Sequence, residues 1–233
     1  MEKTNINVLI ACEESQTICK AFRALGVRAF SCDLQECSGG FPQWHIKGDC
    51  KPVIETGDFV TEDGQRHSVE KWTLIIAHPP CTYLSNAGAK HLWRNHQLNA
   101  ERYAKGLQGR EFFMYFYDLP QHICSRVLIE NPIPSKIYDL PKKTQVIQPY
   151  EYGDPFSKRT YLWLRNLPNL KPTEVLNDYI PFCTSGSYTK SHNPKYKGYS
   201  RKGGSSRSRS KTFKGIALAI AQQYTHYLLE EEE

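Results

Sequence analysis

A strand–helix–strand pattern opens the chain and constrains its fold more than any other feature. Residues 7–11 (NVLIA) form a short apolar run typical of a buried strand, and residues 17–25 carry apolar side chains at helical spacing before Gly26. Residues 27–32 form a second apolar run. Because the connections are short, we expect parallel strands joined by a right-handed crossover. The pattern predicts an α/β fold.

Further apolar runs predict more strands over residues 72–77, 126–130, 144–149 and 160–164. Helical spacing recurs over residues 99–125, where Pro120 favours a break, and over residues 212–229. We therefore expect a Rossmann-like, doubly wound and mostly parallel sheet. We also expect a single domain over residues 1–233, with a basic, loop-rich insertion around 171–211 and a C-terminal helix over 212–229.

Composition limits the class of protein. Hydrophobic residues make up 39% of the 233 residues, the mean hydropathy is −0.57, and no run of 18 apolar residues occurs, so no membrane span is expected. The polar N-terminus does not resemble a signal peptide, and the eight cysteines form neither a CxxC pair nor a disulfide framework. We expect reduced thiols, a cytoplasmic location and no bound metal.

Basic residues are concentrated near the C-terminus. Residues 183–214 contain nine Lys or Arg residues, no Asp or Glu, and three interleaved tyrosines. One interpretation is a flexible, solvated loop. The other is a segment that contacts nucleic acid through phosphates and stacked bases. Under this second interpretation the candidate nucleic-acid-binding residues are Lys190, Lys195, Lys197, Arg201, Arg207 and Arg209, with Ser85 outside the segment.

The run over residues 72–77 leads directly into His78-Pro79-Pro80-Cys81. Neither proline can donate a backbone hydrogen bond, so the pair ends the strand. Cys81 then lies at the carboxyl end of a strand, where open α/β sheets bind their ligands. A thiol at this place is either a nucleophile or an inert buried group.

Acidic residues follow other predicted strands. Glu13 and Glu14 come after the first, Asp33 after the second, and Glu130 ends the run over 126–130. In a doubly wound sheet these ends face one crevice. Asp33 lies about 20 residues beyond the first turn, the spacing at which an acidic residue receives ribose hydroxyls in nucleotide-binding βαβ units.

Three segments carry a resemblance to a known family: Pro-Pro-Cys at 79–81, Glu-Asn-Pro at 130–132 and Tyr-Gly-Asp-Pro-Phe-Ser-Lys-Arg-Thr at 152–160. In this order they resemble the Pro-Cys, Glu-Asn-Val and Gly-x-Pro-Gln-x-Arg-x-Arg motifs of DNA cytosine-5 methyltransferases. The likeness spans residues 7–170 and is to a minimal form, phage or bacterial in type, that lacks a full target-recognition domain.

The resemblance implies a class I S-adenosylmethionine-dependent methyltransferase fold acting on double-stranded DNA. Cys81 would be the nucleophile and Glu130 the acid at the cytosine ring, while Lys158 and Arg159 would contact the substrate. S-adenosylmethionine would be held by the turn after the first strand and by acidic residues after later ones. These cofactor-binding candidates are Cys12, Glu13, Glu14, Ser15, Asp33, Asp49 and Pro79.

The chemistry suits these residue types. Thiolate attack at carbon 6 of cytosine makes carbon 5 nucleophilic, and a carboxyl group near ring nitrogen 3 helps by donating or sharing a proton. Burial is expected to raise the pKa of Glu130 into a useful range. The Cys81 thiol needs an electropositive setting to ionise, which Lys158 or Arg159 can supply.

The sequence also departs from the family pattern. The turn after the first strand contains no glycine, Phe156 stands in place of Gln, and the recognition domain is reduced to roughly residues 171–211. Two alternatives stay open: the same chemistry on RNA or a free cytosine nucleotide, or an inactive methyltransferase fold that binds nucleic acid or protein. Trp93, His91 and His96 are either parts of a mobile lid or ordinary surface residues.

Overall fold

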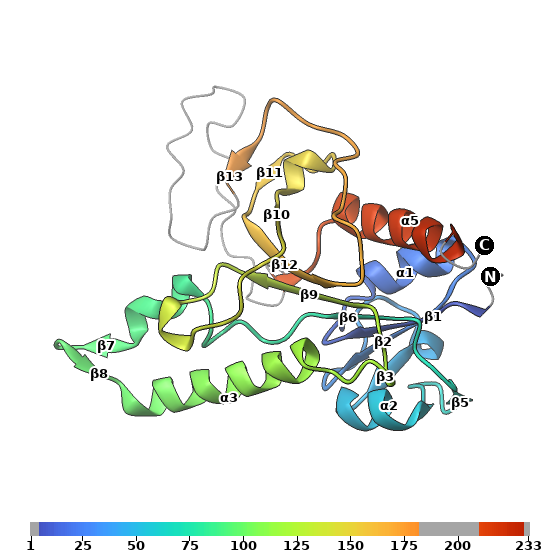
Figure 1. Ribbon diagram of the computed structural model, residues 1–233, viewed down its shortest axis with the longest axis horizontal. Helices are drawn as coiled ribbons and strands as arrows, with labels where there is room; N and C mark the ends of the chain where they lie inside the picture. Colours follow the sequence, from blue (N-terminus) through green and yellow to red (C-terminus); the bar gives the residue numbers. More distant parts are fainter. Residues whose placement is uncertain (1–4, 182–209, 231–233) are drawn as a thin grey trace.

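The computed structural model describes residues 5–181 and 210–230 of the chain. Its main sheet consists of β1 (Asn7–Ala11), β2 (Arg28–Asp33), β3 (His45–Lys47), β6 (Leu74–Ala77), β9 (Val127–Pro132), β10 (Gln145–Ile147) and β12 (Thr160–Arg165). Across this seven-stranded sheet the order is β10-β12-β9-β6-β1-β2-β3 (Figure 1).

Most of the sheet is parallel. β1 pairs in parallel with β2 and β6, β2 with β3, and β6 with β9. β12 runs antiparallel to both of its neighbours, β9 and β10. The protein is therefore an α/β protein with a mixed, mostly parallel sheet, which is compatible with a Rossmann-like fold.

The order of the strands fixes where a ligand can bind. From β1 the chain moves outward to β2 and β3, then returns to form β6 on the opposite side of β1. The topological switch point lies between β1 and β6. In open α/β sheets the binding crevice lies outside the carboxyl ends of the strands at this point. The residues after Ala11 and after Ala77 therefore define the expected site.

Helices cover both faces of the sheet (Figure 1). On one face α1 (Thr17–Ala24) and α5 (Lys214–Glu230) pack against each other and over Val8 and Ile10. On the other face α2 (Cys50–Thr56) and α3 (Ala100–Tyr117) share a core with Leu9 and Ala11. Alternate β1 residues thus point to opposite cores, as the pleat of a strand requires.

The long elements agree with the sequence analysis, but some boundaries differ. β1 spans the predicted residues, and Gly26 adopts a left-handed φ of 79° just after α1. α3 is shorter than the predicted 99–125 stretch, since it ends at Tyr117. Pro120 explains this end, because the residue before a proline disfavours helical geometry and proline lacks the N–H.

The smaller elements have little sequence signal. They include hairpins β4 (Asp58–Val60) with β5 (Arg66–Ser68) and β7 (Trp93–Arg94) with β8 (Gln97–Leu98), and the pair β11 (Phe156–Ser157) with β13 (Ile180–Pro181). The 3-10 helices are η2 (Pro42–Trp44), η3 (Asn86–His91), η4 (Lys136–Tyr138) and η5 (Pro149–Glu151). Within residues 5–181 and 210–230, no helix is long and apolar enough to cross a membrane.

Candidate active site

The Pro-Pro-Cys turn continues directly from β6. The backbone N–H of His78 still donates to the carbonyl oxygen of Ala11 at 3.0 Å, which extends the pairing with β1 by one residue. Pro79 is buried, and its carbonyl oxygen accepts a hydrogen bond from Nδ2 of Asn131 at 2.7 Å. The Asn of the Glu-Asn-Pro segment therefore fixes the turn that presents Cys81, which links the two motifs physically.

Glu130 reaches the same edge from the neighbouring strand. Ala77 of β6 is in register with Ile129 of β9, so Glu130 lies level with His78, just beyond the end of β6. The strand itself runs on to Pro132, two residues beyond the predicted end, because it pairs there with Thr160 of β12. Oε2 of Glu130 accepts a hydrogen bond from Nδ1 of His78 at 2.9 Å.

The antiparallel direction of β12 brings the third segment to the site. β12 begins at Thr160 opposite Pro132, so the residues just before it lie at the carboxyl edge of the parallel strands. Lys158 is half-buried there, and its charge acts on both Cys81 and Glu130. Arg159 is exposed. The structure thus brings together Cys81, Glu130 and Lys158, whereas Arg159 is turned outward.

The surroundings of Cys81 do not favour its thiolate on balance. Burial raises the pKa of the Cys81 thiol, the negative charge of Glu130 raises it further, and Lys158 lowers it only in part. The electropositive setting expected from the sequence is therefore wrong as a net effect. The physical reason is that the carboxylate lies close to the thiol in a partly desolvated site.

The expected direction of the Glu130 pKa shift is also wrong. Burial pushes the pKa of Glu130 upward, but the hydrogen bond from His78 and the charges of His78 and Lys158 outweigh it. The pKa of Glu130 therefore lies below its ordinary value. Desolvation alone would raise this pKa, but the fold places the His78 imidazole beside the carboxylate.

His78 lies in the candidate site, and the sequence analysis did not assign it. Its side chain is 12% exposed, and its Nε2 atom is buried with no hydrogen-bond partner among residues 5–181 and 210–230. Its charge also lowers the pKa of Glu13, so the imidazole lies near two carboxylates. The available signal was a histidine directly after a buried strand and three residues before the candidate nucleophile.

The polar side chains in the turn after β1 form hydrogen bonds within the protein. The carboxylate of Glu13 accepts hydrogen bonds from the backbone N–H groups of Ile18 at 2.7 Å and Cys19 at 3.2 Å, and so caps α1. Glu14 accepts from the Ser38 hydroxyl, and the hydroxyls of Ser15 and Thr17 lie 2.9 Å apart. These three predicted cofactor-binding residues are buried and point into the protein.

The other cofactor-binding candidates are more accessible. Asp33 ends β2 half-buried, and its Oδ1 accepts from the N–H of Gln35 at 2.9 Å. Asp49 is exposed and caps α2 through the N–H of Lys51 at 3.0 Å. Next to Asp33 lies an open hollow of about 580 Å³ whose lining comprises Leu34, Gln35, Glu36, Cys37, Ser38 and Lys47.

Cys12 adopts a left-handed φ of 62° directly after β1. A hydrogen bond with Cys50, followed by burial, raises the pKa of the Cys12 thiol well above its ordinary value. A thiol held protonated in this way is a poor nucleophile. The backbone N–H of Cys12 donates to the carbonyl oxygen of Cys32 at 2.7 Å, so this residue continues the contact between β1 and β2.

Ser85 does not lie on an open surface. It is 9% exposed, its N–H donates to the carbonyl oxygen of Cys81 at 2.9 Å, and it pairs with Pro134 as an isolated bridge. The predicted contact with nucleic acid is not supported by this placement, because Ser85 closes the turn that holds Cys81. The remaining nucleic-acid candidates lie outside the described residues: Lys190, Lys195, Lys197, Arg201, Arg207 and Arg209.

Neither a scan against protein-family models nor a search of the curated proteins finds a match for this chain. The geometry is therefore the basis for any function. It offers a thiol, a carboxylate paired with a histidine, and a lysine at the carboxyl edge of the parallel strands, beside the switch point. Such a set can form a covalent bond to an electrophilic ring carbon and move a proton beside it.

Proposed function

We propose that this protein transfers a methyl group from S-adenosylmethionine to carbon 5 of cytosine in DNA. The observation that carries the proposal is the convergence of Cys81, Glu130 and Lys158 at one edge of the sheet. They come from the three segments whose order resembles the cytosine-5 methyltransferase motifs. As part of the same proposal, we assign the sheet to the class I methyltransferase fold.

The covalent step uses Cys81. Its thiol gives up a proton to the solvent, and the sulfur forms a bond to carbon 6 of the cytosine ring. The displaced electron pair makes carbon 5 a nucleophile. S-adenosylmethionine would supply the electrophilic methyl group that carbon 5 accepts, with its sulfonium leaving as a neutral thioether. A base in the solvent then removes the proton from carbon 5, the bond to carbon 6 breaks, and Cys81 leaves as a thiolate.

The neighbouring side chains Lys158, Glu130 and His78 have separate roles in this reaction. Lys158 is the charged side chain that lowers the pKa of Cys81, so it stabilises the thiolate before attack and after release. Glu130 faces the growing negative charge of the ring and shares a proton with ring nitrogen 3. The hydrogen bond from His78 at 2.9 Å holds the Glu130 carboxylate in place and offers it a proton.

The residues at the end of β2 fit the nucleoside part of S-adenosylmethionine. Oδ2 of Asp33 accepts no hydrogen bond in the described part of the chain, which suits a ribose hydroxyl. Leu34 is 75% exposed beside the hollow and offers an apolar surface to adenine. Glu13, Glu14 and Ser15 do not fit, because their polar atoms already have partners inside the protein.

The direct test measures transfer of tritium from labelled S-adenosylmethionine to duplex DNA, with RNA and cytidine monophosphate as parallel substrates. We expect label in DNA as 5-methylcytosine for wild type, and none for Cys81→Ala. The matched control is Cys124→Ala, since Cys124 lies at the amino edge of the sheet before β9 and should retain activity.

Three other outcomes overturn parts of the proposal. Label in RNA or in the free nucleotide, with none in DNA, would keep the chemistry and replace the substrate. Incorporation that survives Cys81→Ala would remove the nucleophile assigned here. If calorimetry detects no binding of S-adenosylmethionine, the enzyme activity is excluded, and the alternative of an inactive fold that binds nucleic acid or protein is favoured.

A further inference from the structure

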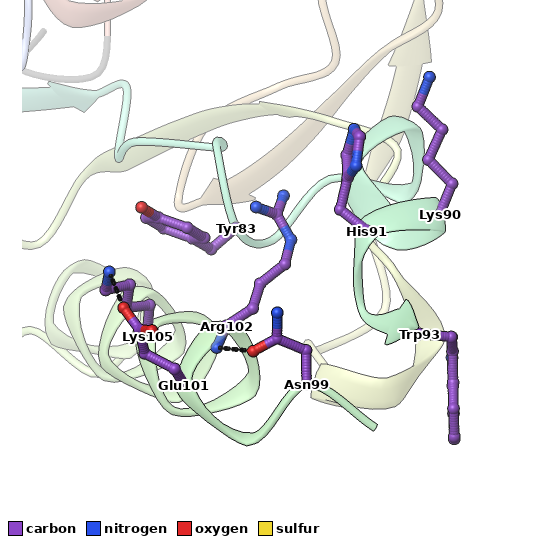
Figure 2. Close-up of a pocket in the computed structure, with 8 residues that line it drawn as sticks. All are labelled: Tyr83, Lys90, His91, Trp93, Asn99, Glu101, Arg102 and Lys105. Carbon is purple, nitrogen blue, oxygen red and sulfur yellow. Dashed lines mark hydrogen bonds and ion pairs between the residues drawn. The ribbon is translucent and has the colours of Figure 1, made fainter. Parts of the chain in front are cut away.

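A second hollow, of about 520 Å³, lies beside the Cys81 loop. Its lining comes from the residues just after Cys81, the end of η3, the start of β7 and the first turns of α3 (Figure 2). These lining residues are Tyr83, Lys90, His91, Trp93, Asn99, Glu101, Arg102 and Lys105. We call this the η3–α3 hollow. None of its residues belongs to the catalytic set described above.

The η3–α3 hollow has an excess of positive charge. Three of its side chains are cations, Lys90, Arg102 and Lys105, and one is a carboxylate. That carboxylate, Glu101, is paired with Lys105 at 2.6 Å on the exposed face of α3. Lys90 is exposed and has no ion pair within the described residues. An anionic ligand would therefore meet Lys90 and Arg102 without displacing an existing acid.

Arg102 ties the hollow to the Cys81 loop. One of its terminal nitrogens donates to the carbonyl oxygens of Thr82 at 3.2 Å and Gly88 at 3.4 Å. Its Nε is buried and has no hydrogen-bond partner in the part of the chain that is described. Figure 2 shows this side chain rising from α3 between Tyr83 and His91. The guanidinium thus fixes the loop and keeps a donor unused.

Aromatic rings accompany these charges. The centroid of the Tyr83 ring lies 5.0 Å from the Arg102 guanidinium carbon and 5.9 Å from Nζ of Lys105. This ring therefore already makes cation–π contacts within the protein. Trp93 is different, because it is 56% exposed and projects outward at the rim (Figure 2). Proteins that bind single-stranded nucleic acids combine exposed aromatic rings, on which bases stack, with cations that contact the backbone.

The hollow is also close to the candidate nucleophile. Tyr83 follows Cys81 by two residues, so at most about 7 Å of extended chain separates their Cα atoms. The backbone N–H groups of Leu84 and Ser85 both donate to the carbonyl oxygen of Cys81, which folds this stretch into a tight turn. A ligand in the hollow would therefore lie next to a base held at Cys81.

We propose that the η3–α3 hollow binds the sugar–phosphate backbone of a DNA strand beside the target cytosine, with Trp93 stacking on a neighbouring unstacked base. Lys90 and Arg102 contact the phosphate, and Lys105 adds to the local positive potential. This inference rests on the proposed function for the identity of the target base. It assigns the strand contact to described residues rather than to the basic segment.

The test measures binding of the full chain to a fluorescein-labelled, 12-nucleotide single strand by fluorescence anisotropy, over a range of salt concentrations. The strand contains no cytosine, and no cofactor is added, so the readout is independent of methyl transfer. The variants are Lys90→Ala and Trp93→Ala, both at exposed positions. Arg102 is left intact, since removing it would release the Cys81 loop.

We expect Trp93→Ala to weaken binding by about fivefold or more with no change in the salt dependence. Lys90→Ala should weaken binding and reduce the slope of log affinity against log salt by about 0.7. The matched controls are Lys71→Ala, exposed before the amino end of β6, and Tyr117→Ala, exposed at the far end of α3. Both controls should bind the strand as wild type does.

Wild-type affinity in both Lys90→Ala and Trp93→Ala would overturn the inference, even if methyl transfer to DNA is found. Tight binding by a polyglutamate peptide with the same sensitivity to Trp93→Ala would also overturn it, since the hollow would then accept acidic protein. Conversely, a result in which the strand binds and the two variants weaken that binding, while no methyl transfer is found, would contradict the proposed function. It would support the strand-binding site in the η3–α3 hollow. The two failures are therefore distinguishable.

Discussion

Nδ1 of His78 lies 2.9 Å from Oε2 of Glu130, and this contact joins the strands β6 and β9 at the edge where the candidate site is built. It makes Glu130 part of a buried pair rather than an isolated acid. It also explains why the pKa of Glu130 falls below its ordinary value although the side chain is desolvated. The histidine therefore controls the charge of the proposed catalytic carboxyl group.

Replacing His78 by Asn should move the pH profile of kcat/KM. Two further charged groups act on the His78–Glu130 pair: Glu13 interacts with His78, and Lys158 interacts with Glu130. Without the hydrogen bond and charge of His78, burial dominates and the pKa of Glu130 rises. The limb of the profile that reports Glu130 should therefore move to higher pH, measured as tritium transfer from pH 5 to 9.

Lys71→Gln provides the control for this measurement, because Lys71 lies at the amino edge of the sheet and should leave the profile unchanged. An unmoved limb in His78→Asn would exclude His78 as the group that sets the ionisation of Glu130. Glu130→Gln should in addition lower kcat by about 100-fold or more, the usual contribution of a positioned acid or base.

Lys158 should control the reactivity of Cys81. Lys158 lowers the pKa of the Cys81 thiol, so Lys158→Gln should raise that pKa further and slow alkylation of Cys81 by iodoacetamide at pH 8. The rate is read by mass spectrometry of the Cys81 peptide. Arg159→Gln removes the same charge from an exposed neighbour and should have a smaller effect. Equal slowing in both variants would show only a general effect of net charge.

Glu13 should make stability depend on pH. Burial is the main reason that the pKa of Glu13 is raised in the folded state. The folded protein therefore keeps this proton longer than the unfolded chain, and stability is lost as pH rises from the ordinary value of 4.5 through the raised pKa. Glu13→Gln cannot lose a proton, so its free energy of unfolding relative to wild type should increase between pH 5 and pH 7.5.

Urea denaturation at the two pH values measures this difference. A relative stability of Glu13→Gln that is independent of pH, or that falls as pH rises, would contradict the role assigned to the buried carboxyl group. Glu13→Ala serves as a second variant. It removes both acceptors for the N–H groups at the start of α1 and should cost about 1–3 kcal/mol.

Gly106→Ala should destabilise the protein, although Ala is the better helix former. A Cβ atom at Gly106 would overlap the ring of Tyr138, which packs against α3. Overpacking of this kind costs about 1–3 kcal/mol. At Gly109 the nearest atoms belong to the flexible side chain of Leu84, so Gly109→Ala should be tolerated better in thermal unfolding. The opposite ranking would argue against the packing of Tyr138.

The main sheet could be predicted because its strands are buried on both faces. Residues 7–11 and 74–77 read as continuous apolar runs for this reason, and helical spacing identified α1 and α5. β3 could not be predicted in the same way. It is three residues long, and its buried His45 is held by Ser31 and by the carbonyl oxygen of Gln35, contacts that only the fold creates.

For the candidate site, the resemblance of three ordered segments to the methyltransferase motifs predicted that Cys81, Glu130 and Lys158 would share one site. It could not predict the charge states, because these depend on neighbours across strands, such as His78 beside Glu130. It also assigned Glu13 to a cofactor, because a residue after a strand was assumed to face the crevice. In the structure the left-handed Gln16 leaves the start of α1 without its usual cap, and Glu13 supplies it.

The covalent bond to Cys81 can be tested with duplex DNA that carries 5-fluorocytosine, in the presence of S-adenosylmethionine. Fluorine leaves no proton to remove at carbon 5, so the thiolate cannot depart after methyl transfer. Mass spectrometry of the digested complex should show the modified base attached to Cys81 in wild type and no adduct in Cys81→Ala. An adduct on another cysteine, or methylated cytosine in ordinary DNA without any trapped adduct, would contradict the mechanism proposed here.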